Sequence, residues 1–145
     1  MKKQILFTIA LSMVALTCFS EEPQNTNTSY NADLNYAQVL FVKAQKINST
    51  WTFHVTVTHN DEGWDHYADA WEIVNVSNGD VIATRVLHHP HENEQPFTRS
   101  LSNVSIPKGV NRVLVRSKCN KHGFEGKKVI LDLSKQKGDD FLIIR

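Results

Sequence analysis

The chain has 145 residues, of which 16 are basic and 15 are acidic, and it contains seven histidines but only two cysteines. This near balance of dispersed charges argues against nucleic acid as a partner, because nucleic-acid-binding domains carry a strongly basic surface. Length and composition favour one globular domain.

The first 20 residues have the pattern of a secretory signal peptide. Two lysines precede an apolar run over residues 5–16, and residues 18–20 provide a cleavage context. The run is shorter than the ~20 residues that a membrane-spanning helix needs, so we expect cleavage and no transmembrane anchor. The protein is therefore predicted to be periplasmic or secreted. Processing as a lipoprotein at Cys18 is the alternative, although Leu16 and Thr17 are poor matches to the small residues expected there.

Cleavage would change the charge and the thiol content of the chain. Fourteen basic residues would remain against fifteen acidic ones, a formal charge of −1. Cys119 would be the one remaining thiol, so an intramolecular disulfide is excluded and a hydrophobic core must hold the fold. The polar residues 21–34 are predicted to form a flexible arm ahead of the domain.

Alternating apolar residues predict β-strands along the rest of the chain. In the second of them, Trp51, Phe53, Val55 and Val57 share one face, and a row of threonines forms the opposite, solvent-facing side. Asn78-Gly79 between two such runs is typical of a β-hairpin. The predicted strands lie at 39–42, 51–57, 70–76, 81–87, 97–106, 110–118 and 127–133.

Seven short strands separated by turns predict an all-β fold, an antiparallel sandwich of the immunoglobulin or fibronectin type. A cupredoxin-like variant of that sandwich is also open. We expect the domain to span residues 35–133. Residues 134–145 form a C-terminal tail that is either an added edge strand or a docked segment.

The segment 88–99, HHPHENEQPFTR, is the first candidate site. His89 and His91 flank Pro90, which favours extended backbone, so their imidazoles can point to the same side as a chelating pair. Glu92 and Glu94 could add oxygen ligands or orient an imidazole. The alternative is a solvated surface loop in which Glu94 and Arg99 form an ion pair.

The segment 64–67 offers a second group of polar and aromatic residues. Asp65 and His66 precede the third strand. His66 could join residues 88–99, which we call the histidine loop, if both lie at one end of the sandwich. Trp64, Tyr67 and Trp71 are expected to be core or rim aromatics. His54 and His59 are placed on, or at the end of, the threonine-lined solvent face and are not expected to be ligands.

The segment CNKHGFEGKKVILDL, which contains Cys119 and His122, resembles the cysteine–histidine loop of the small blue-copper proteins such as plastocyanin. That resemblance implies copper bound by a thiolate and imidazoles, with a weak methionine as axial ligand. Phe124, Glu125 or Gly126 stands where that methionine would fall.

A broader similarity covers most of the domain. GWDHYADAWEIV, ATRVLHHPHENEQPFTRSL and HGFEGKKVILDL resemble segments of a group of small exported bacterial proteins of uncharacterised function. The resemblance implies an exported one-domain β-protein. If the shared motifs mark a site, its residues here are Trp64, Asp65, His66, Tyr67, His89, His91, Glu94, Arg99 and His122.

Two functional hypotheses follow. The first is a periplasmic metal-binding or metal-chaperone module that holds copper or zinc, with His66, His89, His91, His122 and Cys119 as candidate ligands. The second is a metal-free module that binds a protein or another envelope component through the same polar loop and its aromatic rim. An enzyme is the third alternative, and the chain contains neither a GxSxG nor an HExxH motif.

Overall fold

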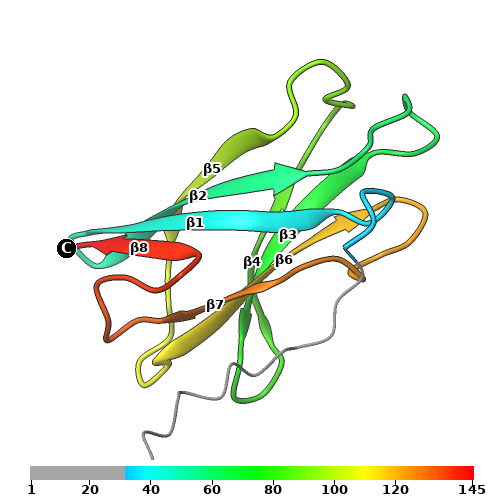
Figure 1. Ribbon diagram of the computed structural model, residues 1–145. Coiled ribbons are helices and arrows are strands. Elements are labelled where there is room, and N and C mark those ends of the chain that lie inside the picture. Colours follow the sequence, from blue (N-terminus) through cyan, green and yellow to red (C-terminus); the bar gives the residue numbers. More distant parts are fainter. Residues whose placement is uncertain (1–31) are drawn as a thin grey trace, which may run out of the picture.

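The computed structural model describes residues 32–145, which fold into eight β-strands (Figure 1). The expected signal peptide at 1–20 and most of the expected arm at 21–34 lie outside the described residues. Within residues 32–145 no helix is both long and apolar enough to cross a membrane. The strands are β1 (Gln38–Ile47), β2 (Thr50–Thr58), β3 (Ala68–Asn75), β4 (Val81–Val86), β5 (Phe97–Val104), β6 (Arg112–Cys119), β7 (Val129–Asp132) and β8 (Phe141–Ile144).

The strands form two four-stranded sheets that pack face to face. One sheet has the order β5-β2-β1-β8 and the other the order β4-β3-β6-β7. All pairings are antiparallel except that of β8, which runs parallel to β1. The predicted β-sandwich is thus confirmed, and each of the seven predicted strands is present. The eighth strand, β8, shows that the C-terminal tail is an added edge strand.

Period-two alternation explains how the strands build the core. Residues of β2 are buried at every second position, and Phe53, Val55 and Val57 have no exposed surface. The same alternation in β6 turns Val113 and Val115 inward against them. Fully burying a side chain of this size contributes about 1.5–3 kcal/mol, so these facing rows account for much of the stability of the sandwich.

One β-bulge interrupts the alternation that the sequence predicts for β1. The register of β1 against β2 shifts between Val39 and Phe41. As a result Val39 and Val42, three positions apart, are both fully buried, whereas Phe41 is 37% exposed. Strict alternation over residues 39–42 would place Val39 and Phe41 on one face, with Leu40 and Val42 on the other. That prediction is wrong, because a bulge inserts one extra residue and reverses the phase of the side chains.

The hairpin prediction at Asn78-Gly79 is confirmed. β3 and β4 pair antiparallel across this turn, and Gly79 has a positive φ of 79°. An L-residue with a side chain rarely adopts that conformation, so glycine is the residue that permits the tight turn.

Antiparallel pairing gathers several connections at one end of the sandwich. β1 begins there, β2 ends there, β3 begins there and β6 ends there, as their registers require. The connection from β4 to β5, residues 87–96, crosses between the two sheets at the same end, since β4 ends beside the start of β3 and β5 begins beside the end of β2. Chain segments that are far apart in sequence can therefore share one site.

Candidate metal centre

His59 lies inside the sandwich at the end of β2. It follows Val57 by two residues and so continues the inward-facing row of this strand. The residue is 1% exposed. The prediction that His59 lies at the end of the solvent-facing threonine row is therefore wrong by one position in phase. His54 does lie on that outer face, where its Nδ1 is 2.7 Å from Oγ of Ser100.

Cys119 ends β6 on the corresponding inward row of the opposite sheet. Val113, Val115, Ser117 and Cys119 are all buried, and Cys119 is 1% exposed. The chain then closes a tight loop, since the amides and carbonyls of Cys119 and Gly123 bond to each other in both directions. The positive φ of Gly123, 66°, permits this turn. Within the loop, the amide of His122 donates a hydrogen bond to Sγ of Cys119 over 3.2 Å.

His66 is presented by a short loop that leads into β3. The amide of Glu62 donates to the carbonyl of His66 over 2.8 Å, and the amide of His66 donates to the carbonyl of Gly63. Gly63 has a φ of 83°, which closes the loop. The side chain of His66 is only 5% exposed. The loop thus turns the imidazole of His66 back into the sandwich instead of toward solvent.

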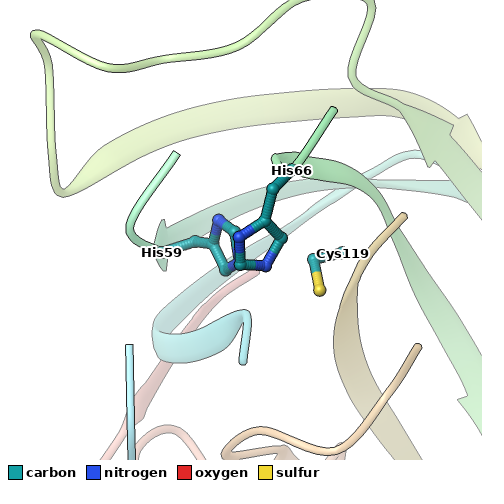
Figure 2. Close-up of side chains that lie close together, drawn as sticks. All are labelled: His59, His66 and Cys119. Carbon is teal, nitrogen blue, oxygen red and sulfur yellow. The ribbon is translucent and has the colours of Figure 1, made fainter. Parts of the chain in front are cut away.

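These three side chains converge. One potential ligand atom from each of His59, His66 and Cys119 lies within 4.8 Å of the other two (Figure 2). The rings of His59 and His66 are perpendicular, with centroids 4.7 Å apart. His122 is exposed and is not in this group of three, but it borders the group from the solvent side: its Nδ1 is 3.4 Å from Sγ of Cys119, and its ring centroid is 5.0 Å from that of His66. We call these four residues the His3Cys cluster.

A main-chain carbonyl faces the same four side chains. The oxygen of Asn35, just ahead of β1, lies 3.1 Å from Nε2 of His59 and 3.3 Å from Nε2 of His66. It lies 3.0 Å from Nδ1 of His122 and 3.6 Å from Sγ of Cys119. One main-chain oxygen therefore contacts all four members of the His3Cys cluster.

In each of the two buried imidazoles, a carboxylate is hydrogen-bonded to the ring nitrogen that faces away from the Asn35 oxygen. Oδ1 of Asp61 is 2.6 Å from Nδ1 of His59, and Oε2 of Glu62 is 3.2 Å from Nδ1 of His66. An ionised carboxylate only accepts hydrogen bonds, so the proton of each neutral ring belongs on Nδ1. Nε2 of His59 and Nε2 of His66 then both carry lone pairs that point into the cluster.

The side chain of Asp61 is fully buried, and both of its carboxylate oxygens accept hydrogen bonds. Its Oδ1 also accepts a hydrogen bond from the amide of Ala68, and its Oδ2 accepts one from the amide of His91 over 2.6 Å. Burial alone would raise the pKa of Asp61, but the bonds from the His59 ring and from the amides of His91 and Ala68 together lower it. Asp61 is therefore an ionised carboxylate that fixes the tautomer of His59.

The histidine loop lies at the same end of the sandwich but does not enter the cluster. Among the described residues, neither His89 nor His91 belongs to a group of three such ligand atoms within 4.8 Å. The ring of His91 instead stacks on Phe97, with centroids 3.9 Å apart and planes 8° apart. The expectation that His89 and His91 join His66 in one ligand set therefore does not fit the geometry, because the stacked ring is committed to Phe97.

His91 and His89 do lie side by side, with ring centroids 4.5 Å apart, as the Pro90 argument predicts. The side chain of His91 is 2% exposed, and its Nδ1 has no hydrogen-bond partner. Desolvation, followed by the charges of Arg99 and His89, lowers the pKa of His91 below the usual histidine value. His91 is therefore an uncharged packing residue at neutral pH.

The other predicted site residues lie around the rim. Trp64 is 66% exposed and its ring meets that of Tyr67 edge to face, whereas Trp71 is fully buried in the core. Asp65 is exposed beside them. Arg99 and Glu94 form the predicted ion pair, with Nη2 and Oε1 2.5 Å apart.

Comparison with known proteins gives one relative. A protein of Halomicrobium mukohataei with the name "Putative lipoprotein" is 37% identical to this chain over 108 residues, which are 74% of this chain and 52% of that protein. The chain therefore spans about half the length of this curated relative. No family model matches the chain, and no solved structure matches it.

Proposed function

We propose that this domain binds one transition-metal ion in the His3Cys cluster, through Nε2 of His59, Nε2 of His66, Sγ of Cys119 and Nδ1 of His122. The observation that carries the proposal is the convergence of these four donor atoms, from three separate segments of chain, around a single carbonyl oxygen within 3.0–3.6 Å. Donors of this kind are common singly, but their convergence at one point is what a metal site requires.

The protonation of the rings supports a cation at this point. Asp61 and Glu62 hold the Nδ1 protons of His59 and His66, so the Nε2 lone pairs face the Asn35 oxygen at 3.1 and 3.3 Å. Lone pairs at that separation repel one another unless a proton lies between them or a metal ion binds both. In protein metal sites, a histidine ligand usually donates a hydrogen bond from its non-ligating ring nitrogen to a carboxylate or carbonyl, which orients the ring.

The donor set narrows the class of metal. A thiolate and three imidazoles suit a soft or borderline ion such as Cu(I), Zn(II) or Fe(II), whereas Ca²⁺ and Mg²⁺ prefer oxygen. The thiolate is the metal-binding form of cysteine, and the main-chain amide of His122 donates a hydrogen bond to Sγ of Cys119. In a tetrahedral zinc site neighbouring donor atoms are about 3.3–3.6 Å apart, so the donors of His59, His66 and Cys119, which lie within 4.8 Å of one another, would close in on the bound ion.

The test is a metal titration of protein purified from cells that express the full chain and then freed of metal with a chelator. We expect one Zn(II) or Cu(I) per chain, bound with release of protons. Co(II) as a probe should give a thiolate charge-transfer band that Cys119→Ser abolishes. His59→Ala, His66→Ala and His122→Ala should lower affinity by more than the about 10–100-fold typical of outer residues.

Two matched controls sharpen the titration. His54→Ala removes an imidazole from the outer face of β2, and His89→Ala removes one from the histidine loop; both should keep the affinity of the unaltered chain. If His89→Ala lowers affinity and His59→Ala does not, the His3Cys cluster is not the metal site. Unfolding of each metal-free variant is measured in parallel, to separate lost ligands from lost structure.

A second candidate function is a metal-free interaction module, and the exposed Trp64 favours it. An open groove beside this indole is lined by Trp64, His89, Pro90, His91, Glu92, Asn93 and Glu94. Exposed tryptophans next to a polar rim are frequent in protein interfaces. Absence of metal binding above that of a denatured control would favour this function.

An exported location is part of the same proposal. The pattern of the first 20 residues is that of a secretory signal, and the name of the relative describes a lipoprotein. Fractionation of cells that express the full chain and its Cys18→Ser variant distinguishes a periplasmic protein from a lipid-anchored one. A transition-metal ion at this site would then be acquired in the cell envelope.

A further inference from the structure

The segment Asp33–Tyr36, which we call the strap, lies across the His3Cys cluster just ahead of β1. Its carbonyls are not equivalent. The carbonyl of Leu34 accepts a hydrogen bond from the amide of Asn60 over 2.8 Å. The carbonyls of Asp33 and Tyr36 both accept from the side-chain amide of Gln38. The carbonyl of Asn35, between them, is the one directed at the cluster.

The Asn35 carbonyl oxygen can be compared with a metal ligand through its distances to the four donor atoms of the cluster. They are 3.0 Å to His122 Nδ1, 3.1 Å to His59 Nε2, 3.3 Å to His66 Nε2 and 3.6 Å to Cys119 Sγ. Metal–ligand bonds to N, O and S are shorter, about 2.0–2.3 Å. Adjacent ligands of one metal, in contrast, are about 3.0–3.6 Å from each other, and the longest such distance involves sulfur. A metal ion bound by the cluster would therefore have the Asn35 oxygen as a neighbouring vertex of its coordination sphere.

We propose that the main-chain carbonyl of Asn35 is the fifth ligand of the metal, which makes the site five-coordinate with an N3SO donor set. This inference rests on the proposed metal function and adds to it a ligand that no side-chain motif reveals. A main-chain oxygen is an established weak axial ligand in sites built from histidine and cysteine. Because it is neutral, it completes the coordination without changing the charge of the centre.

The strap is built to hold this oxygen in place. The hydrogen bond from Asn60 fixes the strap to the residue that follows His59, so the carbonyl and one ligand belong to a single bonded unit. The ring of Tyr36 packs against that of His122 with centroids 5.1 Å apart. Gly126 packs against the carbonyl of Ala37, the residue that directly follows the strap, since a Cβ at Gly126 would be 2.1 Å from that oxygen. Ligands held by such surroundings need little reorganisation on metal binding.

The test measures the NMR chemical shift of the Asn35 carbonyl carbon. In ¹³C,¹⁵N-labelled protein purified from cells expressing the full chain, the HNCO signal of the Tyr36 amide reports the carbonyl carbon of Asn35. Coordination of its oxygen by Zn(II) should move that carbon downfield, in step with the Nε2 resonances of His59 and His66. The carbonyl carbons of Leu34 and Tyr36 are internal controls and should move less.

The outcomes separate this inference from the proposed function. An upfield or absent shift of the Asn35 carbon, while the imidazole nitrogens respond to Zn(II), would overturn the fifth ligand and leave the His3Cys site intact. If the imidazole nitrogens do not respond either, both proposals are overturned. In the variant Asn35→Ala the carbonyl carbon of residue 35 should still move downfield on addition of Zn(II), because the main-chain oxygen is kept. Loss of the shift in that variant would assign the ligand to the side chain and refute the main-chain assignment.

Discussion

Oδ1 of Asp61 lies 2.6 Å from Nδ1 of His59, and both side chains are completely shielded from solvent. The second oxygen of the same carboxylate accepts a hydrogen bond from the main-chain amide of His91. One buried charge therefore joins the His3Cys cluster to the histidine loop. The loop supports the candidate metal site through this carboxylate and not through its own imidazoles.

We predict that Asp61→Asn impairs both metal affinity and stability. The amide nitrogen of asparagine must face either the Nδ1 proton of His59 or the amide of His91, so one buried donor loses its acceptor. We expect metal affinity to fall about 10–100-fold and the free energy of unfolding to fall by about 1–3 kcal/mol. Zn(II) titration and urea unfolding measure the two quantities.

Glu62→Gln is the matched control for that change. Glu62 faces His66 in the same way, but its side chain is 57% exposed, so water can replace the lost interaction. Its effect on stability should be much smaller than that of Asp61→Asn. Equal effects from the two variants would show that burial of Asp61 is not what makes it important.

We predict that His91 makes the metal-free protein less stable in mild acid. Desolvation and the charges of Arg99 and His89 lower the pKa of His91 in the folded state. As the pH falls below about 6.5, the unfolded chain takes up a proton that folded His91 does not, so folding stability decreases until the folded-state pKa is reached. Above that range the contribution of His91 is independent of pH.

His91→Phe isolates this contribution. Phenylalanine keeps the stacking on Phe97, and Nδ1 of His91 has no hydrogen-bond partner to lose. The variant should lose less stability than the unaltered chain between about pH 7 and pH 5, as measured by urea unfolding in the presence of a chelator. Parallel pH profiles for the two proteins would contradict the prediction.

We predict that Gly126→Ala weakens metal binding without altering a ligand. The added Cβ would lie 2.1 Å from the oxygen and 2.7 Å from the carbon of the Ala37 carbonyl, so Ala37 must move, and with it the strap that directly precedes it. A displaced Asn35 carbonyl can no longer reach the metal, and affinity for Zn(II) should decrease. Isothermal titration measures the effect.

Gly138→Ala is the control for crowding in general. Its added Cβ would meet the ring of Phe141 at 2.3 Å, in the connection between β7 and β8. It should lower stability, as overpacking does by about 1–3 kcal/mol, and leave affinity for Zn(II) unchanged. If both variants lower affinity equally, the strap has no particular importance for the site.

The sequence predicts most of the sandwich because alternation of apolar residues is a local property. It also contained the signal for His59, which continues the row of Phe53, Val55 and Val57 by two residues. Assigning His59 to the threonine row was an error of phase. The phase of Val39 and Phe41 could not be predicted in the same way, because a bulge depends on the partner strand.

The candidate site was predictable only in part. Cys119 and His122 form a local motif whose tight loop fixes their proximity, and His66 was expected to reach this end of the fold. His89 and His91 form the more conspicuous pair, yet stacking on Phe97 commits His91 to packing. The Asn35 carbonyl has no sequence signature, since every residue carries one.

The sequence by itself determined the class of fold, the hairpin at Asn78-Gly79 and the presence of imidazole and thiol donors, because these depend on neighbouring residues. Only the tertiary structure decided which donors meet. The antiparallel registers of β1, β2, β3 and β6 bring Asn35, His59, His66 and Cys119 to one end of the sandwich. That convergence depends on pairing between strands that are distant in sequence, and local residue preferences do not predict it.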